Sequence, residues 1–164
     1  MQDRKQRVFF DTSFFIRLYK QDDPDHKNAR NYWERFRKEN YEMFLSTIVA
    51  AEFGAGGAIK QLPYKYVTVL PFNINDAERS SVFAQVAFEN KRRGVIKLEN
   101  RVVIPNDTKI LAQAEEIKAD LFIARDDNCR TVYQLMKDND LLSFNYLDLR
   151  TPPNEYFSEL FEDF

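Results

Sequence analysis

The sequence of 164 residues contains a single histidine, His26, and a single cysteine, Cys129. One cysteine rules out an internal disulfide and fits a reducing cytoplasm. The histidine stands in the segment QDDPDHKN, which we interpret as a polar turn that enters a helix. The chain therefore lacks the residues for a Ser/His/Asp triad, a Cys/His pair or a histidine-rich zinc site. Any hydrolysis that it catalyses must depend on carboxylates and on metal ions bound through oxygen.

Long apolar segments and a strong excess of positive charge are absent as well. No run approaches the roughly 20 apolar residues that a membrane helix needs. The N-terminus, MQDRKQRVFFD, has neither the apolar stretch nor the cleavage site of a signal peptide. The net charge of −2 excludes a basic protein that wraps nucleic acid, although acids gathered in one site are compatible with RNA binding. We expect a cytoplasmic protein without a membrane partner.

Aromatic residues, in contrast, are abundant: the chain has 15 Phe, 8 Tyr and 1 Trp. This excess predicts a core, or a partner surface, built from rings. Near the C-terminus, apolar residues recur at helical spacing at Tyr156, Phe157, Leu160, Phe161 and Phe164. We expect residues 151–164 to form a helical tail that docks on the preceding domain, residues 1–150, or on a partner. A homodimer or a bound protein partner is expected for the same reason.

Short apolar segments alternate with segments of helical periodicity along the chain. The predicted strands cover residues 8–10, 43–45, 66–70, 121–123 and 143–147. Predicted helices follow Asp11 and the Ser46-Thr47 pair, and others cover residues 25–38, 77–91, 105–117 and 130–137. Asn75 or Asp76 is the expected cap of the helix at 77–91, and residues 95–103 form a loop or a small hairpin. The alternation predicts an α/β protein with three α/β/α layers, a mostly parallel central sheet and Rossmann-like topology.

Three aspartates, Asp11, Asp107 and Asp126, stand at predicted junctions of strands and helices. In open parallel sheets, functional sites form where strands end and helices begin. Each of the three also has a purely structural interpretation, because aspartate is a favoured helix N-cap and suits the positive end of the helix dipole.

Glu52 is the only charged residue in TIVAAEFGAGGAI, residues 47–59. A carboxylate among apolar neighbours is costly unless it is paired or binds a metal. The alternatives are an exposed edge of the helix or an ion pair with an arginine. The glycines at 54, 56 and 57 either end this helix early or allow a close backbone approach; we favour the early end.

Four converging acids would repel one another, by about 4 kcal/mol for two carboxylates ~4 Å apart at an effective dielectric of ~20. Such a cluster persists around cations, and ligands that are all oxygen favour Mg²⁺ or Mn²⁺. One or two of these ions can activate a water for in-line attack on a phosphodiester. The acids Asp11, Glu52, Asp107 and Asp126 are therefore candidate ligands of a hydrolytic metal site.

The segments VFFDTSFFIRLY, STIVAAEF and IPNDTKILAQAEEIKADLFIARDDN, in this order and spacing, resemble the PIN-domain family. Within it, the resemblance is to VapC-type toxins of bacterial and archaeal toxin–antitoxin pairs, over residues 8–149. It implies a PIN-like fold and an endoribonuclease that uses Mg²⁺ or Mn²⁺ bound by Asp11, Glu52, Asp107 and Asp126. It also implies that Thr12, Ser13 and Asn128 orient metal-bound water or the RNA phosphate, and that a toxin would have an antitoxin partner.

The sequence departs from the family pattern near the fourth acid. Ala124 stands where the family often has Thr or Ser, and Asn128 stands where it often has a second acid. Asp127 is therefore an alternative fourth metal ligand. The same departures leave open a PIN-like scaffold, weak or inactive as a nuclease, that binds RNA or protein; absent metal binding would distinguish it.

A phosphoacceptor receiver domain shares the doubly wound fold and clustered acids. That alternative needs an adjacent acidic pair after the first strand and a lysine after the last one. The chain instead has Asp11 followed by Thr12 and Ser13, and its last predicted strand, LSFNYLDL, has no lysine. The sequence therefore disfavours a receiver domain.

Overall fold

The computed structural model describes residues 4–94 and 103–162. Its strands are β1 (Arg7–Phe10), β2 (Glu42–Ser46), β3 (Thr68–Leu70), β4 (Leu121–Ala124) and β5 (Asn145–Asp148). Its helices are α1 (Thr12–Tyr19), α2 (His26–Lys38), α3 (Thr47–Gly54), α4 (Ile74–Arg92), α5 (Val103–Glu116), α6 (Asp127–Asp138) and α7 (Pro153–Glu162), with a 3-10 turn at Ile59–Gln61. The loop or hairpin expected at 95–103 lies outside the described residues, except for Val103, which begins α5.

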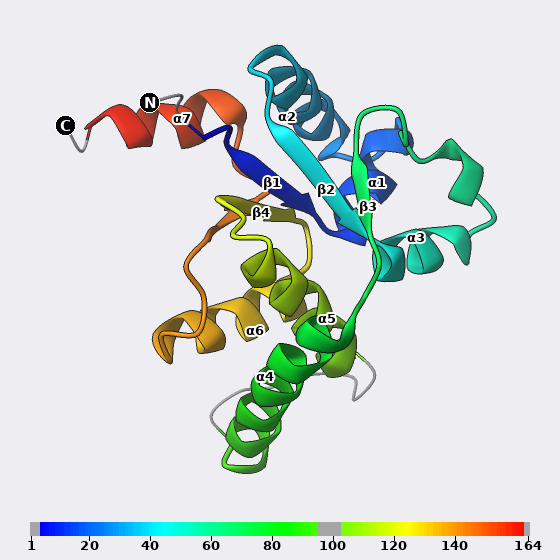
Figure 1. Cartoon of the computed structure of the whole chain (residues 1–164). Helices are drawn as coiled ribbons and strands as arrows, with labels where there is room; N and C mark the ends of the chain where they lie inside the picture. Colours follow the sequence, from blue (N-terminus) through cyan, green and yellow to red (C-terminus); the bar gives the residue numbers. More distant parts are fainter. Residues whose placement is uncertain (1–3, 95–102, 163–164) are drawn as a thin grey trace.

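The five strands form one sheet in the order β3-β2-β1-β4-β5, and all neighbouring pairs are parallel. Helices α1, α2 and α7 lie on one face of the sheet, and α4, α5 and α6 lie on the other (Figure 1). The predicted three-layer α/β/α architecture with a parallel sheet is therefore confirmed. No helix in the described part of the chain is long and apolar enough to cross a membrane.

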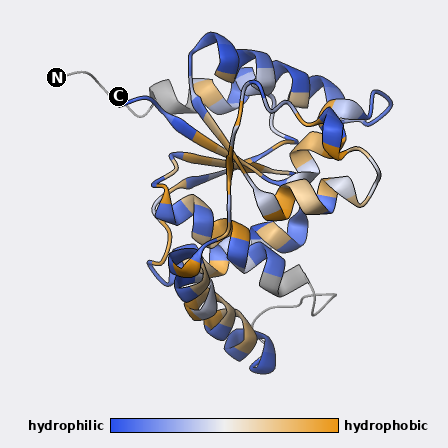
Figure 2. Cartoon of the chain, turned by 45° about the vertical axis from the view of Figure 1, so that its right-hand side comes forward, coloured by the Kyte–Doolittle hydropathy of each residue, from blue (hydrophilic) through white to orange (hydrophobic). Residues whose placement is uncertain are grey.

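Aromatic rings make up much of the core between the layers. Phe9 of β1 lies in register with Phe122 of β4, and their rings stack with centroids 5.8 Å apart. Phe122 also stacks on Phe144, at 5.9 Å. Figure 2 shows the hydrophobic strands at the centre and hydrophilic residues on the outer helix faces. The core thus accounts for much of the aromatic excess without a partner.

The C-terminal helix α7 contacts α2. The Tyr32 hydroxyl donates to the Thr151 carbonyl at 2.6 Å. The Phe157 ring packs against Tyr32, and the Arg35 guanidinium lies 3.5 Å from its centroid. The side chains of Leu160, Phe161 and Phe164, which belong to the expected apolar stripe, lie outside the described residues.

Several predicted boundaries were wrong for local reasons. The third strand begins at Thr68 because Tyr66 belongs to a turn, in which its N–H donates to the Pro63 carbonyl at 2.9 Å. The last strand begins at Asn145 because the Ser143 N–H and hydroxyl bind the Glu115 carboxylate.

Two helix starts also differ from the prediction. The cap of α4 is Asn73, which forms a capping box with Asp76, so the helix begins earlier than predicted. Helix α6 begins at Asp127, capped by Asp126, because the Asp126 carboxylate accepts the Cys129 N–H at 2.9 Å.

Candidate functional site

The candidate site lies at the carboxyl ends of the central strands β1 and β4. From β1 the chain adds β2 and then β3 on one side of the sheet, and it then crosses to the other side of β1 to add β4 and β5. The order of strand addition therefore reverses between β1 and β4. Such a switch point opens a crevice at the carboxyl edge of a parallel sheet. Asp11 directly follows β1, and its N–H donates to Ile123 of β4 at 3.1 Å. Asp126 follows β4 by two residues, so the fold itself brings these two acids to one place.

Asp11 caps α1 and is buried, with 5% of its surface exposed. Its carboxylate accepts the Ser13 N–H at 3.0 Å and the Ser13 hydroxyl at 2.5 Å. Burial raises the pKa of Asp11 to about 6, against the lowering effect of the Ser13 hydrogen bonds, and the charges of Asp126 and Glu52 raise it further. The cap interpretation is therefore correct for Asp11, but a cap alone does not require this burial among acids.

Asp107 is not a helix cap. Helix α5 begins at Val103, so Asp107 lies in its second turn, and the N-cap interpretation was wrong. The side chain is 6% exposed, and its Oδ2 atom is buried without a hydrogen-bond partner in the described residues. Burial, followed by the charges of Asp11, Asp126 and Glu52, raises the pKa of Asp107 to about 9. A buried carboxylate oxygen without a partner is costly unless a proton or a cation occupies it.

Glu52 projects from α3, which is capped by Ser46 and ends at Gly54, as expected of an early end. Its carboxylate accepts a hydrogen bond from the Thr12 hydroxyl and another, at 2.9 Å, from the Asn106 side-chain amide. Within residues 4–94 and 103–162, no arginine or lysine forms an ion pair with Glu52. The described structure thus offers no arginine partner for this half-buried acid.

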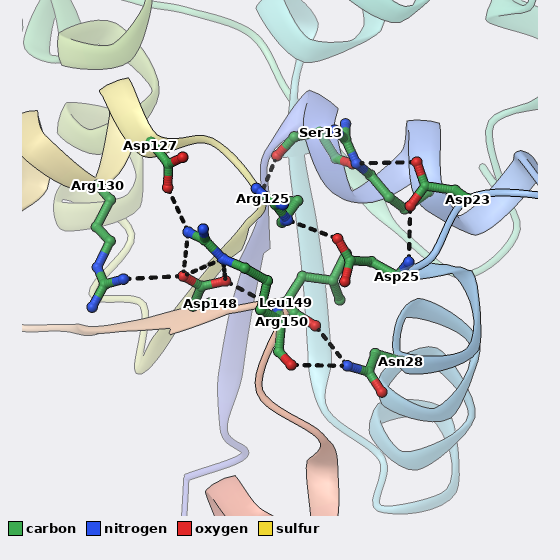
Figure 3. Close-up of polar contacts among 11 residues, drawn as sticks. Ser13, Asp23, Asp25, Asn28, Arg125, Asp127, Arg130, Asp148, Leu149 and Arg150 are labelled. Carbon is green, nitrogen blue, oxygen red and sulfur yellow. Dashed lines mark hydrogen bonds and ion pairs between the residues drawn. The ribbon is translucent and has the colours of Figure 1, made fainter.

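The adjacent acids Asp126 and Asp127 have different surroundings. Asp126 is half-buried, and its negative charge raises the pKa of both Asp11 and Asp107. Asp127 is exposed, and its carboxylate pairs with Arg150 at 2.5 Å (Figure 3). Of the two, Asp126 is the acid that interacts with the other candidate acids.

The hydroxyls of Thr12 and Ser13, the two residues after Asp11, form hydrogen bonds with other groups of the protein. The Ser13 hydroxyl donates to Asp11 and accepts the Arg125 N–H at 2.7 Å, and Ser13 is buried. The Thr12 hydroxyl donates to Glu52. Asn128 is half-buried in the first turn of α6.

All four candidate acids contribute to raising the pKa of one buried thiol. Burial and the charges of Asp107, Asp11, Asp126 and Glu52 raise the pKa of the Cys129 thiol well above its usual value. The acids therefore converge from four separate segments of the chain. They do not form a closed cage: in the described ranges 4–94 and 103–162, no three His, Cys, Asp or Glu side chains are already arranged around a common metal position.

Two residues at the site were not identified from the sequence. Asn106 stands 54 positions from Glu52, and only the packing of α5 beside α3 brings them together. Arg125 binds the Asp25 carboxylate through Nε at 2.7 Å and, through its N–H, the Ser13 hydroxyl (Figure 3). An amide or arginine next to an aspartate is too common to identify either residue in advance.

The chain is similar to a known protein family over most of its length. The family model described as PIN domain matches residues 8–135 of the chain. No curated protein is similar enough in sequence to count as a relative of this chain.

Among solved structures, VapBC-1 from nontypeable Haemophilus influenzae is similar, with a TM-score of 0.58 and 23% identity. The match covers 89% of this chain and 100% of that chain. VapBC2 from Rickettsia felis, solved with a DNA fragment from the promoter, has a TM-score of 0.54 at 14% identity, covering 87% and 100% of the two chains. VapC20 from Mycobacterium tuberculosis, a sarcin–ricin loop cleaving toxin, has a TM-score of 0.50 at 18% identity, covering 76% and 93%. At these identities the similarity establishes the fold.

Proposed function

The chain belongs to the PIN-domain family, and on this basis we propose that it is a metal-dependent endoribonuclease. PIN-domain proteins are generally nucleases that use divalent metals. The observation that carries the proposal is the buried Oδ2 atom of Asp107, which has no hydrogen-bond partner in the described residues. It belongs to a carboxylate whose pKa is raised by three neighbouring acids. A divalent cation would satisfy this oxygen and remove the repulsion.

Asp11, Glu52, Asp107 and Asp126 would hold Mg²⁺ or Mn²⁺, since hard cations prefer carboxylate oxygens. Mg²⁺ keeps several of its waters and is usually bound by one or two carboxylates. It therefore does not need a closed cage of protein ligands, and acids that converge without forming one fit Mg²⁺. When bound, such an ion lowers the pKa of a coordinated water and stabilises negative charge on a phosphate.

The surrounding residues hold these acids in place. Ser13 binds Asp11 with two hydrogen bonds and is itself fixed by the Arg125 N–H. Because its hydroxyl already donates and accepts, we assign Ser13 to positioning Asp11 rather than to contacting RNA. Thr12 and Asn106 hold the two oxygens of Glu52 in the same way. Thr12 and Asn128 are the remaining candidates for orienting water or phosphate.

Asp126 is the proposed fourth ligand, in preference to Asp127. The charge of Asp126 acts on Asp11 and Asp107. Asp127 is held by Arg150, and its side chain is 72% exposed. Asp127 is therefore neutralised by a cation of the chain and does not need a metal.

The toxin of a toxin–antitoxin pair is the cellular role we propose, because the similar solved structures include VapBC proteins and the toxin VapC20. It would act in the cytoplasm on RNA and bind an antitoxin protein, and we also expect a homodimer. A small open reading frame beside this one would support the antitoxin.

Cleavage of RNA should require a divalent metal. We expect the purified chain to cut single-stranded or looped RNA in Mg²⁺ or Mn²⁺ and to lose this activity in EDTA, because the chain has a single histidine and the proposed attack depends on a water activated by a metal ion. Gel analysis of a labelled RNA, with metal restored after EDTA, measures this. Cleavage that persists undiminished in EDTA would rule out the mechanism, and absent cleavage together with absent metal binding would favour the scaffold.

A further inference from the structure

Two arginines and two aspartates form a network at the carboxyl ends of β4 and β5 (Figure 3). The Arg150 guanidinium contacts Asp148 through Nη2 at 2.7 Å and Asp127 at 2.5 Å. Nη1 of Arg130 contacts the same Asp148 carboxylate at 3.2 Å. One carboxylate, that of Asp148, therefore holds both guanidinium groups side by side.

Asp148 is a fixed partner of the two arginines. Its side chain is 14% exposed, and its backbone lies in register with Ala124 of β4. Burial raises the pKa of Asp148, but the hydrogen bonds from Arg150 and the charge of Arg130 outweigh burial and lower it. The carboxylate therefore remains ionised and anchors both cations.

Asp127, in contrast, is an exchangeable partner. Its side chain is 72% exposed, and within residues 4–94 and 103–162 it forms an ion pair with Arg150 alone. An exposed ion pair of this kind contributes little stability. The side chains of Arg130 and Arg150 are 59% and 40% exposed. An arginine carries five N–H donors in a planar fork, so both retain donors for an anion.

The network adjoins the acidic site. Asp127 follows Asp126 in the chain, and the Tyr146 hydroxyl of β5 donates to the Asp126 carbonyl at 3.1 Å. A cavity of about 410 Å³ borders the network at Arg130 and Asp148, and its lining includes Tyr133, Tyr146 and Tyr156 and one further acid, Glu155. This volume is within the range of small-ligand sites, so it leaves room for the sugar and base attached to a bound phosphate.

We propose that Arg130 and Arg150 bind a phosphate of the RNA strand beside the acidic site, and that this phosphate displaces Asp127 from Arg150. The inference rests on the proposed function, because it assigns the phosphate to an RNA substrate. Asp148 keeps the two guanidinium groups in place during the exchange. Asp127 thus occupies, in the free protein, the position that the phosphate takes in the complex.

The test is binding of a single-stranded RNA oligonucleotide by fluorescence anisotropy at several salt concentrations. All variants are made in an Asp11→Asn background, so that the RNA stays intact. Arg130→Gln and Arg150→Gln should each weaken binding by roughly tenfold, the effect of losing one charge-assisted contact. Each should also reduce the slope of log affinity against log salt by about 0.7. Arg150→Lys should recover only part of the loss, because lysine keeps the charge but not the planar fork.

Asp127→Asn gives the sharpest outcome. It should strengthen RNA binding several-fold, because it removes the carboxylate that competes with the phosphate. If Asp127 were a metal ligand, the same change would leave binding unchanged or weaken it.

Arg4→Gln is the matched control, because Arg4 is an exposed arginine paired with one aspartate, Asp120, near the amino end of β4. It should leave RNA binding and its salt dependence unchanged. Thermal melts verify that each variant is folded. Among the described residues Arg130 has a single ion-pair partner, Asp148, so Arg130→Gln keeps the measurement interpretable if Arg150→Gln does not fold.

The phosphate site and the nuclease can fail separately. If Arg130→Gln and Arg150→Gln bind RNA as Arg4→Gln does while the unmodified chain cleaves RNA, the phosphate site is wrong and the nuclease stands. If the chain never cleaves RNA but its binding depends on both arginines, the phosphate site stands and the nuclease is wrong. RNA binding that is absent altogether overturns the phosphate site.

Discussion

Asp107→Asn is expected to abolish RNA cleavage and, at the same time, to stabilise the metal-free protein. The carboxylate is 6% exposed and lies among three other acids, which together with burial raise its pKa to about 9. In metal-free buffer above neutral pH, the Asp107 carboxyl must either take up a proton on folding or stay charged among the other acids. The neutral amide does neither, so we expect a gain of a few kcal/mol in the free energy of unfolding. Thermal melts should show it, at about 2–4 °C per kcal/mol for this chain length.

The pH dependence of this gain has a definite sign. Between the usual pKa of 3.8 and the folded value of about 9, the folded state binds more protons at Asp107 than the unfolded state does. This group therefore makes the metal-free protein less stable as pH rises through that window. The advantage of Asp107→Asn should grow from pH 5 to pH 9. An advantage that is constant with pH would contradict the raised pKa.

Asp76→Asn is the matched control for Asp107→Asn. Asp76 is also a buried aspartate in a helix, at 4% exposed, but its carboxylate accepts the Asn73 N–H at 2.9 Å in the capping box of α4. Its replacement should lower stability by about 1 kcal/mol and leave cleavage intact. If both variants changed stability in the same direction, the difference in their surroundings would not explain the result.

Glu52→Gln is expected to reduce cleavage by at least about 100-fold while the fold is kept. Loss of groups that merely orient metal ligands costs about 10–100-fold, and a direct ligand should cost no less. The described partners of Glu52, the Thr12 hydroxyl and the Asn106 amide, are neutral, so the free energy of unfolding should change by only about 1 kcal/mol. Calorimetric Mn²⁺ titration beside thermal melts separates the two effects.

The opposite outcome for Glu52→Gln is equally specific. If Glu52 were half of a buried ion pair, its neutralisation would cost about 3–5 kcal/mol with or without metal. Normal Mn²⁺ binding by such a destabilised variant would remove Glu52 from the metal site. Glu115→Gln serves as the control, because in the described part of the chain Glu115 also accepts only from neutral groups, the Ser143 N–H and hydroxyl. It should leave cleavage unchanged.

The fold, and the placement of Asp11 and Asp126 at one edge of the sheet, could be predicted from the sequence because both follow from local patterns. Strands β1 and β4 are short apolar segments followed by Asp11 and Asp126, and parallel strands place their carboxyl ends at one edge. Glu52 was identified by its apolar neighbours. Asp107 was singled out for a partly wrong reason, since α5 begins at Val103 and makes Asp107 an interior residue rather than a cap.

What the sequence left open depends on contacts between distant residues. The choice between Asp126 and Asp127 rests on Arg150, which is 23 positions from Asp127. The Asn106 amide and the Asp25–Arg125 pair bridge 54 and 100 positions. No periodicity or spacing encodes such pairs, so only the packed structure identifies them.

Calorimetric titration of the chain with Mn²⁺ at pH 7.5, in two buffers of different ionisation enthalpy, tests the metal site most directly. With a pKa of about 9, Asp107 carries a proton at this pH and must lose it to bind a metal. We therefore predict Mn²⁺ binding with release of about one proton per bound ion, and loss of both the proton release and most of the affinity in Asp107→Asn. Absence of Mn²⁺ binding, or binding of equal affinity without proton release in both proteins, would contradict the account.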